Sequence, residues 1–186
     1  MSKKFQNAFS RQEQNSMKRK KDYMKYAQSL ECTLQLLESQ LHDSDDTSEV
    51  IRNVLKTACS FYQGDWAGFL QIDLELGLWT PYVWYHATTS DQTEALLHEC
   101  ESAEFFTRWM DAMHSNDAIC FSSIDELENP SNKELEMYRK LNIKGVIAVP
   151  VKPRPTGFLV IRNPQRYVHR SSMLQLGLRV LVWCGN

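Results

Sequence analysis

The sequence lacks the close cysteine pairs that mark metal-binding and disulfide-rich proteins. Its five cysteines are an odd number, and no CxxC motif or Cys/His spacing suited to zinc occurs among them. Reduced and mostly buried thiols are expected from such a pattern in a cytoplasmic protein. We therefore predict no metal site and no disulfide framework.

Long hydrophobic runs are also missing. The most apolar stretch, residues 173–184, is too short to span a bilayer and contains Arg179. The N-terminus is polar and lacks the apolar core of a secretion signal. We expect a cytoplasmic protein without membrane contact.

The chain has little net charge, -2 in total, but the charge is unevenly spread. Residues 1–26 contain eight basic and two acidic side chains, a balance of +6, so the remainder carries -8. The basic segment has few aromatic residues and no nucleic-acid recognition motif. We interpret it as a solvated segment separate from the main domain, and we expect no direct nucleic-acid partner.

The sequence does contain enough apolar material for a core, with 42% hydrophobic and 11% aromatic residues in 186 positions. This length favours one domain with an extension. The extension, residues 1–45, carries apolar residues alternately four and three apart, as in a coiled coil. This seam consists of Tyr23, Ala27, Leu30, Leu34, Leu37 and Leu41. It fits a helix that forms a homodimer, and it equally fits an amphipathic helix that packs against its own domain.

The rest of the chain alternates between predicted helices and strands. Apolar spacing predicts helices over about 46–63, 102–114, 130–141 and 171–183, and strands over about 65–73, 78–86 and 118–124. Two further strands flank the Pro-rich turn at 152–155, and Pro150, which lacks a ladder donor, is expected at an edge or bulge. Two hairpins predict a largely antiparallel sheet. Amphipathic helices must cover it, which gives a three-layer α/β sandwich.

The order of these segments resembles that of a GAF domain. The resemblance covers about residues 48–162 and depends on five pieces in order: VIRNVLKTACSFYQGD followed by WAGFLQID, then WTPYVWYH, DAICFSSIDEL, NKELEMYRKLNIKGVIAVPV and TGFLVIRNP. It implies a GAF-like three-layer sandwich over residues 46–168, with a central sheet of five to six strands. In this family terminal helices cover one face and often form a dimer bundle, while intermediate helices and loops enclose a ligand cavity on the other. Residues 169–186 then resemble a signalling helix.

The hairpin geometry assigns side chains to the two faces of the sheet. With a two-residue turn at Glu75-Leu76, Phe69, Tyr82 and Trp84 share one face, and the drier opposite face suits helix packing. The helix at 102–114 and the strand after it supply the other walls of a small-molecule pocket. The predicted pocket residues are Phe69, Tyr82, Trp84, Phe106, Trp109, Met113, Phe121 and Ser123. The alternative is that these aromatic side chains fill the space themselves.

The sequence lacks most of the motifs that mark the known ligand-binding and enzyme classes of the GAF family. Beyond Asn132-Lys133 the cyclic-nucleotide motif is absent, and neither Cys100 nor Cys120 has the context of a bilin attachment site. A lone histidine is more often a surface residue than a haem ligand. In the free methionine sulfoxide reductase branch a catalytic thiol needs a lowered pKa, whereas the apolar neighbours of Cys120 would raise its pKa. We predict no catalysis and no cofactor.

The sequence therefore predicts a non-catalytic, cytoplasmic GAF sensory or regulatory domain. It would bind an unknown small molecule or partner and relay the change through terminal dimer helices to an output module, such as a diguanylate cyclase, a kinase or a transcription regulator. One alternative is a structural dimerisation or interaction module with a self-filled pocket. A second is an enzyme similar to free methionine sulfoxide reductase.

Overall fold

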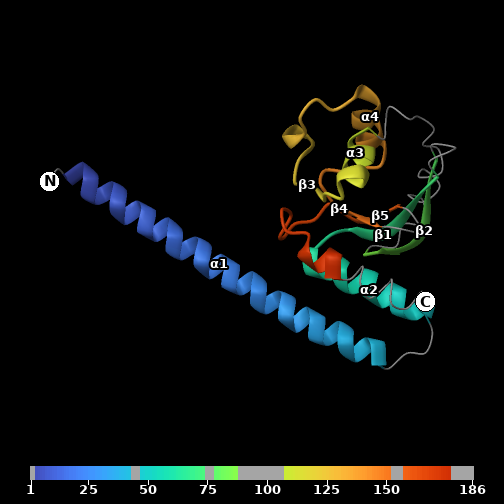
Figure 1. Ribbon diagram of the computed structural model, residues 1–186, viewed down its shortest axis with the longest axis horizontal. Helices are drawn as coiled ribbons and strands as arrows, with labels where there is room; N and C mark the ends of the chain where they lie inside the picture. The colour runs from blue at the N-terminus through green and yellow to red at the C-terminus, as the bar shows by residue number, and fades with distance from the viewer. Residues whose placement is uncertain (1–2, 43–46, 74–77, 88–106, 152–156, 177–186) are drawn as a thin grey trace. The chain divides into compact units, whose positions relative to one another are not determined.

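The computed structural model describes residues 3–42, 47–73, 78–87, 107–151 and 157–176 (Figure 1). The chain divides into two compact units, Met1–Ser39 and Gln40–Asn186. None of the helices among these residues is long and apolar enough to cross a membrane.

The first unit consists of most of α1, which runs from Lys3 to His42 and has 40 residues. At 1.5 Å per residue, such a helix is about 60 Å long. It begins well before the predicted seam and ends one residue after the last seam residue, Leu41. Its solvent-exposed side chains include large apolar ones: Met17, Tyr23, Met24 and Leu36.

The second unit contains the remaining elements in the predicted order. They are α2 (Thr47–Tyr62), β1 (Trp66–Asp73), β2 (Leu78–His86), α3 (Thr107–Ser115), β3 (Ile119–Phe121), the 3-10 helix η4 (Ile124–Glu126), α4 (Asn132–Lys140), β4 (Val146–Val151) and β5 (Gly157–Arg162). The five strands form one sheet in the order β2-β1-β5-β4-β3, and every neighbouring pair is antiparallel. The predicted antiparallel sheet is confirmed.

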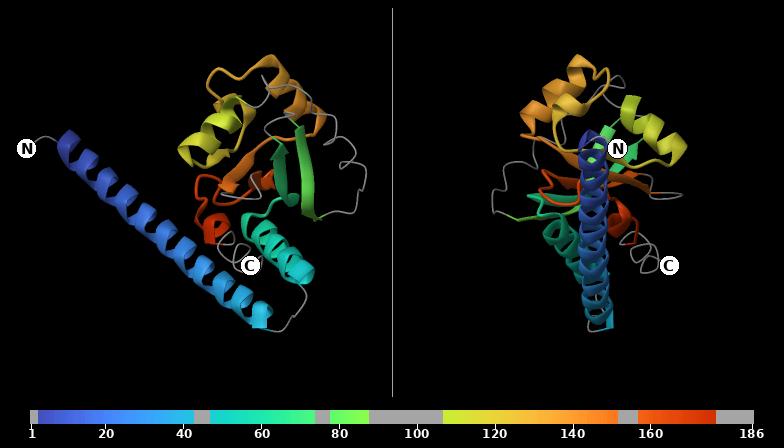
Figure 2. Two further views of the ribbon diagram at one scale, coloured as in Figure 1. Left: turned by 45° about the vertical axis from the view of Figure 1, so that its right-hand side comes forward. Right: turned by 90° about the vertical axis from the view of Figure 1, so that its left-hand side faces the viewer.

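Helices cover both faces of this sheet, as Figures 1 and 2 show. One face carries α2, and the chain that follows β5 returns to the same side. The other face carries α3 and α4. The three-layer sandwich predicted from amphipathic helices around a two-sided sheet is thus confirmed.

Differences from the predicted element bounds have local causes. The strand expected over 118–124 ends at Phe121, because Ser123 caps η4 with its side-chain oxygen, which accepts a hydrogen bond from the Asp125 N–H. The start of the helix expected at 102 lies outside the described residues, as does the end of the helix expected over 171–183. Residues 172–176 of that last helix are helical.

Pro150 occupies a position that tolerates the missing N–H. Within the described chain, β3 pairs only with residues 146–148 of β4. Pro150 pairs with Phe158 of β5 and lies beyond the end of β3, so β4 has a strand partner on one side only at this point. The expectation of an edge position is therefore correct, although β4 itself is not an edge strand.

A β-bulge corrects the predicted assignment of faces. Phe69 pairs with Val83 and Leu70 pairs with Pro81, so Tyr82 is an extra residue in β2. Such a residue changes the side to which the following side chains point. Trp84 therefore shares the α3–α4 face with Leu70. Leu70 belongs to the core cluster on this face, and Trp84 packs against that cluster. Phe69 lies on the opposite face.

Candidate functional site

The α3–α4 face of the sheet is lined by large apolar side chains that alternate along each strand. Trp66, Leu70 and Ile72 of β1 share this face with Phe158 and Val160 of β5. The two helices add Trp109, Met113, Met137 and Tyr138. This α3–α4 face is where the sequence and the family resemblance place a ligand cavity.

Aromatic rings on the α3–α4 face contact one another directly. The centroids of Trp109 and Phe158 lie 4.9 Å apart in an edge-to-face arrangement, and those of Phe121 and Tyr138 lie 5.5 Å apart. Trp109 and Tyr138 are almost fully buried. These contacts fix the helix α3 to β5 and the helix α4 to β3.

A buried chain of polar groups joins α3 to α4 above this aromatic layer. The indole N–H of Trp109 donates to the Tyr138 hydroxyl at 3.1 Å, and that hydroxyl donates to Glu134 Oε1 at 2.9 Å. Arg108 Nε donates to the same Glu134 oxygen at 2.9 Å. Burial is the main cause that raises the pKa of Tyr138, so its hydroxyl stays protonated and donates.

The start of α4 places Glu134 in this chain. Ser131 is the N-cap, and its side-chain oxygen accepts the Glu134 N–H at 3.0 Å. In a capping box the glutamate of S-x-x-E would reach back to the cap. Here the carboxylate, on a side chain 4% exposed, meets Arg108 and Tyr138 instead. Its charge is therefore compensated by a cation and a hydroxyl.

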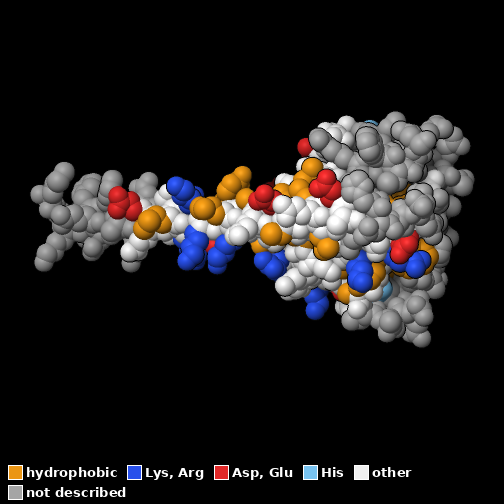
Figure 3. Space-filling view, turned by 90° about the horizontal axis from the view of Figure 1, so that it is seen from below, with side chains coloured by type: hydrophobic (Ala, Val, Ile, Leu, Met, Phe, Trp, Pro, Cys, Tyr) orange, Lys and Arg blue, Asp and Glu red, His pale blue; other side chains and the backbone are white. Residues whose placement is uncertain are grey.

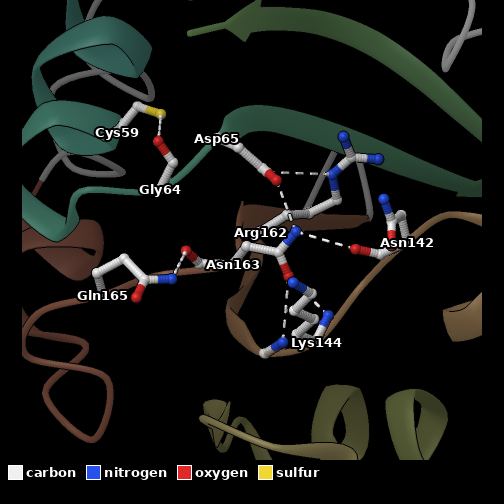
Figure 4. A network of polar contacts seen from close by, with 9 residues as sticks. Cys59, Gly64, Asp65, Asn142, Lys144, Arg162, Asn163 and Gln165 are labelled. Atoms are coloured by element: carbon white, nitrogen blue, oxygen red, sulfur yellow. Dashed lines mark hydrogen bonds and ion pairs between the residues drawn. The ribbon is translucent and has the colours of Figure 1, made fainter. Parts of the chain in front are cut away.

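A second polar cluster lies where β1 begins and β5 ends (Figure 4). The Asn163 side chain donates to Asp65 Oδ2 at 2.6 Å and to the Asn142 carbonyl at 3.0 Å. Its oxygen accepts the N–H groups of Lys144 and Gly145 at 2.6 and 3.3 Å. Asn163 has a left-handed backbone with φ 50°, which asparagine tolerates better than most residues. One side chain thus joins β1, β5 and the loop before β4.

Backbone hydrogen bonds continue from this cluster in two directions. Toward α4, Ile143 N donates to the Tyr138 carbonyl at 2.7 Å. Toward α2, the N–H groups of Gln165 and Arg166 donate to the Tyr62 carbonyl, each at 3.0 Å. A continuous set of bonded segments therefore runs from α3 and α4 to the last residue of α2.

Most of the predicted pocket residues are found on the α3–α4 face where their position is described. Trp109, Met113 and Phe121 belong to its core cluster, and Trp84 packs against it. Phe69 was wrongly assigned, because the drier side of β1, with Trp66, Leu70 and Ile72, is the side that faces α3 and α4. Ser123 is half-buried and serves as the cap of η4. The Tyr82 side chain and Phe106 lie outside the described residues.

Glu134, Tyr138 and Phe158 were not predicted as site residues from the sequence. Two signals would have helped to find the first pair. Glu134 stands four residues before Tyr138, so both lie on one side of α4, and Met137 and Leu141 make that side apolar. A carboxylate on the apolar side of a helix needs a buried partner.

The thiols near the sheet are poorly suited to nucleophilic chemistry. Burial raises the pKa of the Cys120 thiol to about 11, as its apolar neighbours predicted. Burial, with a smaller contribution from Asp65, raises the pKa of Cys59 to about 12. Among the described residues, no group of three or more His, Cys, Asp or Glu side chains is arranged to hold a metal ion.

Comparison with known proteins identifies the fold. No family model and no curated protein matches the sequence. Solved structures with the same fold include the phycoerythrobilin-bound GAF domain of a cyanobacterial phytochrome, with a TM-score of 0.61 and 11% identity over 85% of this chain and 95% of that one.

Two further structures with the same fold belong to other kinds of protein. The GAF domain of a phosphoenolpyruvate-protein phosphotransferase from Coxiella burnetii has a TM-score of 0.58 and 9% identity, over 85% of this chain and 91% of that one. The substrate complex of free methionine-R-sulfoxide reductase from Neisseria meningitidis has a TM-score of 0.57 and 14% identity, over 86% and 89%. The fold is GAF-like, which confirms the resemblance at the level of the fold.

Proposed function

We propose that this GAF-like domain is a non-catalytic sensory or regulatory module of the cytoplasm. A small molecule or a partner binds at the α3–α4 face. The change passes through the terminal helices of a homodimer to an output module, such as a diguanylate cyclase, a kinase or a transcription regulator. Neither nucleic acid nor membrane is a direct partner in this proposal.

The observation that carries the proposal is the bonded connection from α3 and α4 to the end of α2. It uses Trp109 and Tyr138, then the loop around Asn142, and then Asn163 and Tyr62. A ligand that moves α4 would alter the position of Asn142, and Asn163 holds Asn142 against the segment that bonds to α2. Regulation requires such an element that both sites contact.

The proposed absence of catalysis is supported by the state of the Cys120 thiol. A nucleophilic cysteine requires a thiolate at neutral pH. Burial of Cys120 keeps its thiol protonated, since its pKa is raised to about 11. The likeness to the sulfoxide reductase therefore concerns the fold, and turnover of free methionine sulfoxide by this chain is not expected.

One observation favours the second candidate, a structural or interaction module. The rings of Trp109 and Phe158, and those of Phe121 and Tyr138, already touch each other. If these contacts occupy the whole α3–α4 face, the domain needs no small molecule to complete its core. Its function would then be dimerisation or partner binding alone.

A thermal-shift experiment separates these two functions. A small molecule that binds only the folded chain must raise the unfolding midpoint. Native mass spectrometry of the full chain from its own host identifies a co-purified mass, and that compound is then added back. Failure of every co-purified or screened metabolite to raise the midpoint would favour the interaction module.

Hydrogen exchange then tests the relay. We expect the added compound to slow exchange of the Gln165 and Arg166 amides, which bond to Tyr62. In Asn163→Gly the compound should still raise the unfolding midpoint, but it should no longer slow the exchange of the Gln165 and Arg166 amides. If the protection persists in Asn163→Gly, the proposed connection through Asn163 is wrong.

A further inference from the structure

A buried arginine lies on the same face of the sheet as the aromatic core. Arg162 is the last residue of β5, is 4% exposed, and pairs with Trp66 on one side and Val146 on the other. Because directly paired residues share a face, its side chain lies on the α3–α4 side with these two core residues. Its guanidinium carbon is 5.0 Å from the centre of the Trp66 ring.

Three hydrogen-bond donors at this place have no acceptor. In the part of the chain that the structure describes, Arg162 Nε, Arg162 Nη1 and Trp66 Nε1 are buried and make no hydrogen bond. The nearest carboxylate oxygen, Asp65 Oδ1, is 3.9 Å from Arg162 Nε and is itself without a hydrogen bond. The other Asp65 oxygen is engaged by Asn163. Figure 4 shows the guanidinium extending past Asp65, away from the Asn163 cluster.

Such an arrangement is costly when nothing else binds to it. A buried donor without an acceptor destabilises the folded state, and a buried cation does so more strongly. Burial is the main cause that lowers the pKa of Arg162, and Asp65 opposes it only in part. The Trp66 indole is held in place at the same time, because its ring lies against Gly68, where any added Cβ would overlap it.

We propose that Arg162 and the Trp66 indole N–H bind the carboxylate of a small organic acid. This inference depends on the proposed function, since it names the ligand class of the α3–α4 face. A carboxylate would offer acceptors to the guanidinium and to the indole in a desolvated place. Its apolar part would lie against the neighbouring aromatic core.

The charge of Asp65 favours a monoanion over a phosphate. Asp65 Oδ1 lies 3.9 Å from Arg162 Nε, so an anion bound by Arg162 also lies near this carboxylate. A singly charged carboxylate adds one negative charge near Asp65, whereas a phosphate dianion adds two. The repulsion is correspondingly smaller for the carboxylate.

Two nitrogen-bound protons report directly on this site in the full chain. We would titrate acetate, butyrate and benzoate into 15N-labelled protein and follow the Arg162 Nε–H and Trp66 Nε1–H signals. Arg162→Lys and Trp66→Phe assign those signals. Benzamide, the uncharged counterpart of benzoate, and inorganic phosphate are the comparison compounds. We expect butyrate or benzoate to shift both signals saturably and benzamide to shift neither.

Affinity then tests the role of the guanidinium. Arg162→Gln should weaken carboxylate binding about tenfold or more, the usual effect of losing a charged hydrogen bond. Arg139→Gln, at an exposed position of α4, removes the same charge away from the site and should leave the affinity unchanged. If Arg162→Gln does not fold, Arg162→Lys keeps the charge without the planar fork and should still bind more weakly.

The failures of the two proposals are distinguishable. If no carboxylate moves either signal, or phosphate moves both as strongly, the carboxylate assignment is overturned. A neutral compound that raises the unfolding midpoint equally in wild type and Arg162→Gln overturns it as well, while the sensory function stands. If no compound of any charge raises the midpoint and no signal moves, both proposals fail together.

Discussion

Single polar side chains hold this domain together at places where the apolar core ends. Asn163 makes four hydrogen bonds to Asp65, Asn142, Lys144 and Gly145. Its backbone has φ 50°, a conformation that glycine also adopts without strain. The contribution of its side chain can therefore be measured separately from that of its backbone.

Asn163→Gly should lower the free energy of unfolding by about 2–3 kcal/mol more than Asn116→Gly does. Asn116 is also left-handed, with φ 62°, but it is an exposed residue just after α3. The change in unfolded-state entropy is the same in both variants. Urea denaturation measures the difference. Equal losses would mean that the Asn163 side chain contributes nothing to stability.

The chemical reactivity of Cys120 is set by its surroundings. Its pKa of about 11 leaves about one thiol in a thousand ionised at pH 8. Alkylation at Cys120 should therefore rise about tenfold per pH unit from pH 8 to pH 10. Cys32, which is exposed on α1, should react before Cys120. Peptide mapping after timed iodoacetamide treatment measures both rates. A Cys120 rate that is already at its maximum at pH 8 would restore the reductase hypothesis.

The same raised thiol pKa values have a consequence for stability. Above pH 9, the ordinary value, an unfolded chain loses thiol protons that the folded chain retains at Cys59 and Cys120. The unfolded state is then favoured, so stability should fall as the pH rises from 9 toward 11. Cys120→Ala should make that decline shallower than in wild type, as measured by urea denaturation at each pH. An unchanged slope would show that Cys120 does not titrate as expected.

At the scale of elements, α3 and α4 behave as one cover because a buried hydroxyl connects them. Tyr138 accepts from Trp109 on α3 and donates to Glu134 on α4. Removal of the Tyr138 hydroxyl leaves Trp109 and Glu134 buried, each with one hydrogen bond fewer. The two helices are otherwise joined through Arg108 and Glu134.

Tyr138→Phe should lower the free energy of unfolding by about 1–3 kcal/mol. Combined with Trp109→Phe, it should show a coupling of about 0.5–1.5 kcal/mol, because both changes remove the same hydrogen bond. Tyr167→Phe is the matched control, since that hydroxyl accepts from the neighbouring Arg166 at the surface. Additive effects of Trp109→Phe and Tyr138→Phe would contradict the proposed connection.

At the scale of the whole molecule, the two units differ in how their apolar side chains are covered. Most of the 40-residue α1 forms the first unit, and a single helix has no core of its own. Basic side chains gather along it with hydrophobic side chains between them (Figure 3). Of the seam residues, Tyr23 is exposed whereas Leu37 is buried, and dimerisation through the seam stays a proposal.

Leu30→Glu together with Leu34→Glu should convert the dimer into a monomer. The two charges would lie in the seam, where they repel each other and the partner helix. Gln28→Glu with Gln35→Glu adds the same charge at exposed positions off the seam and should leave the dimer intact. Native mass spectrometry measures the oligomeric state. A wild-type monomer, or a seam variant that remains dimeric, would disprove the role of α1.

The sequence alone determined the elements and their order. Hydrophobic periodicity and turn residues are local properties, and they specified α2, the two hairpins and α4 within a few residues. The apolar neighbours of Cys120 were likewise enough to predict the direction of its pKa. Two hairpins and amphipathic helices then left few arrangements other than a covered antiparallel sheet.

Only the tertiary structure decided which side chains meet. The bulge at Tyr82 reversed the side of Phe69 relative to Trp84, because one extra residue changes the alternation of a strand. Glu134 acquired its surroundings from α3, and Arg162 acquired its surroundings from β1, elements that are distant from them in the chain. Burial and pairing of charged groups depend on those distant partners, so no local pattern contains them.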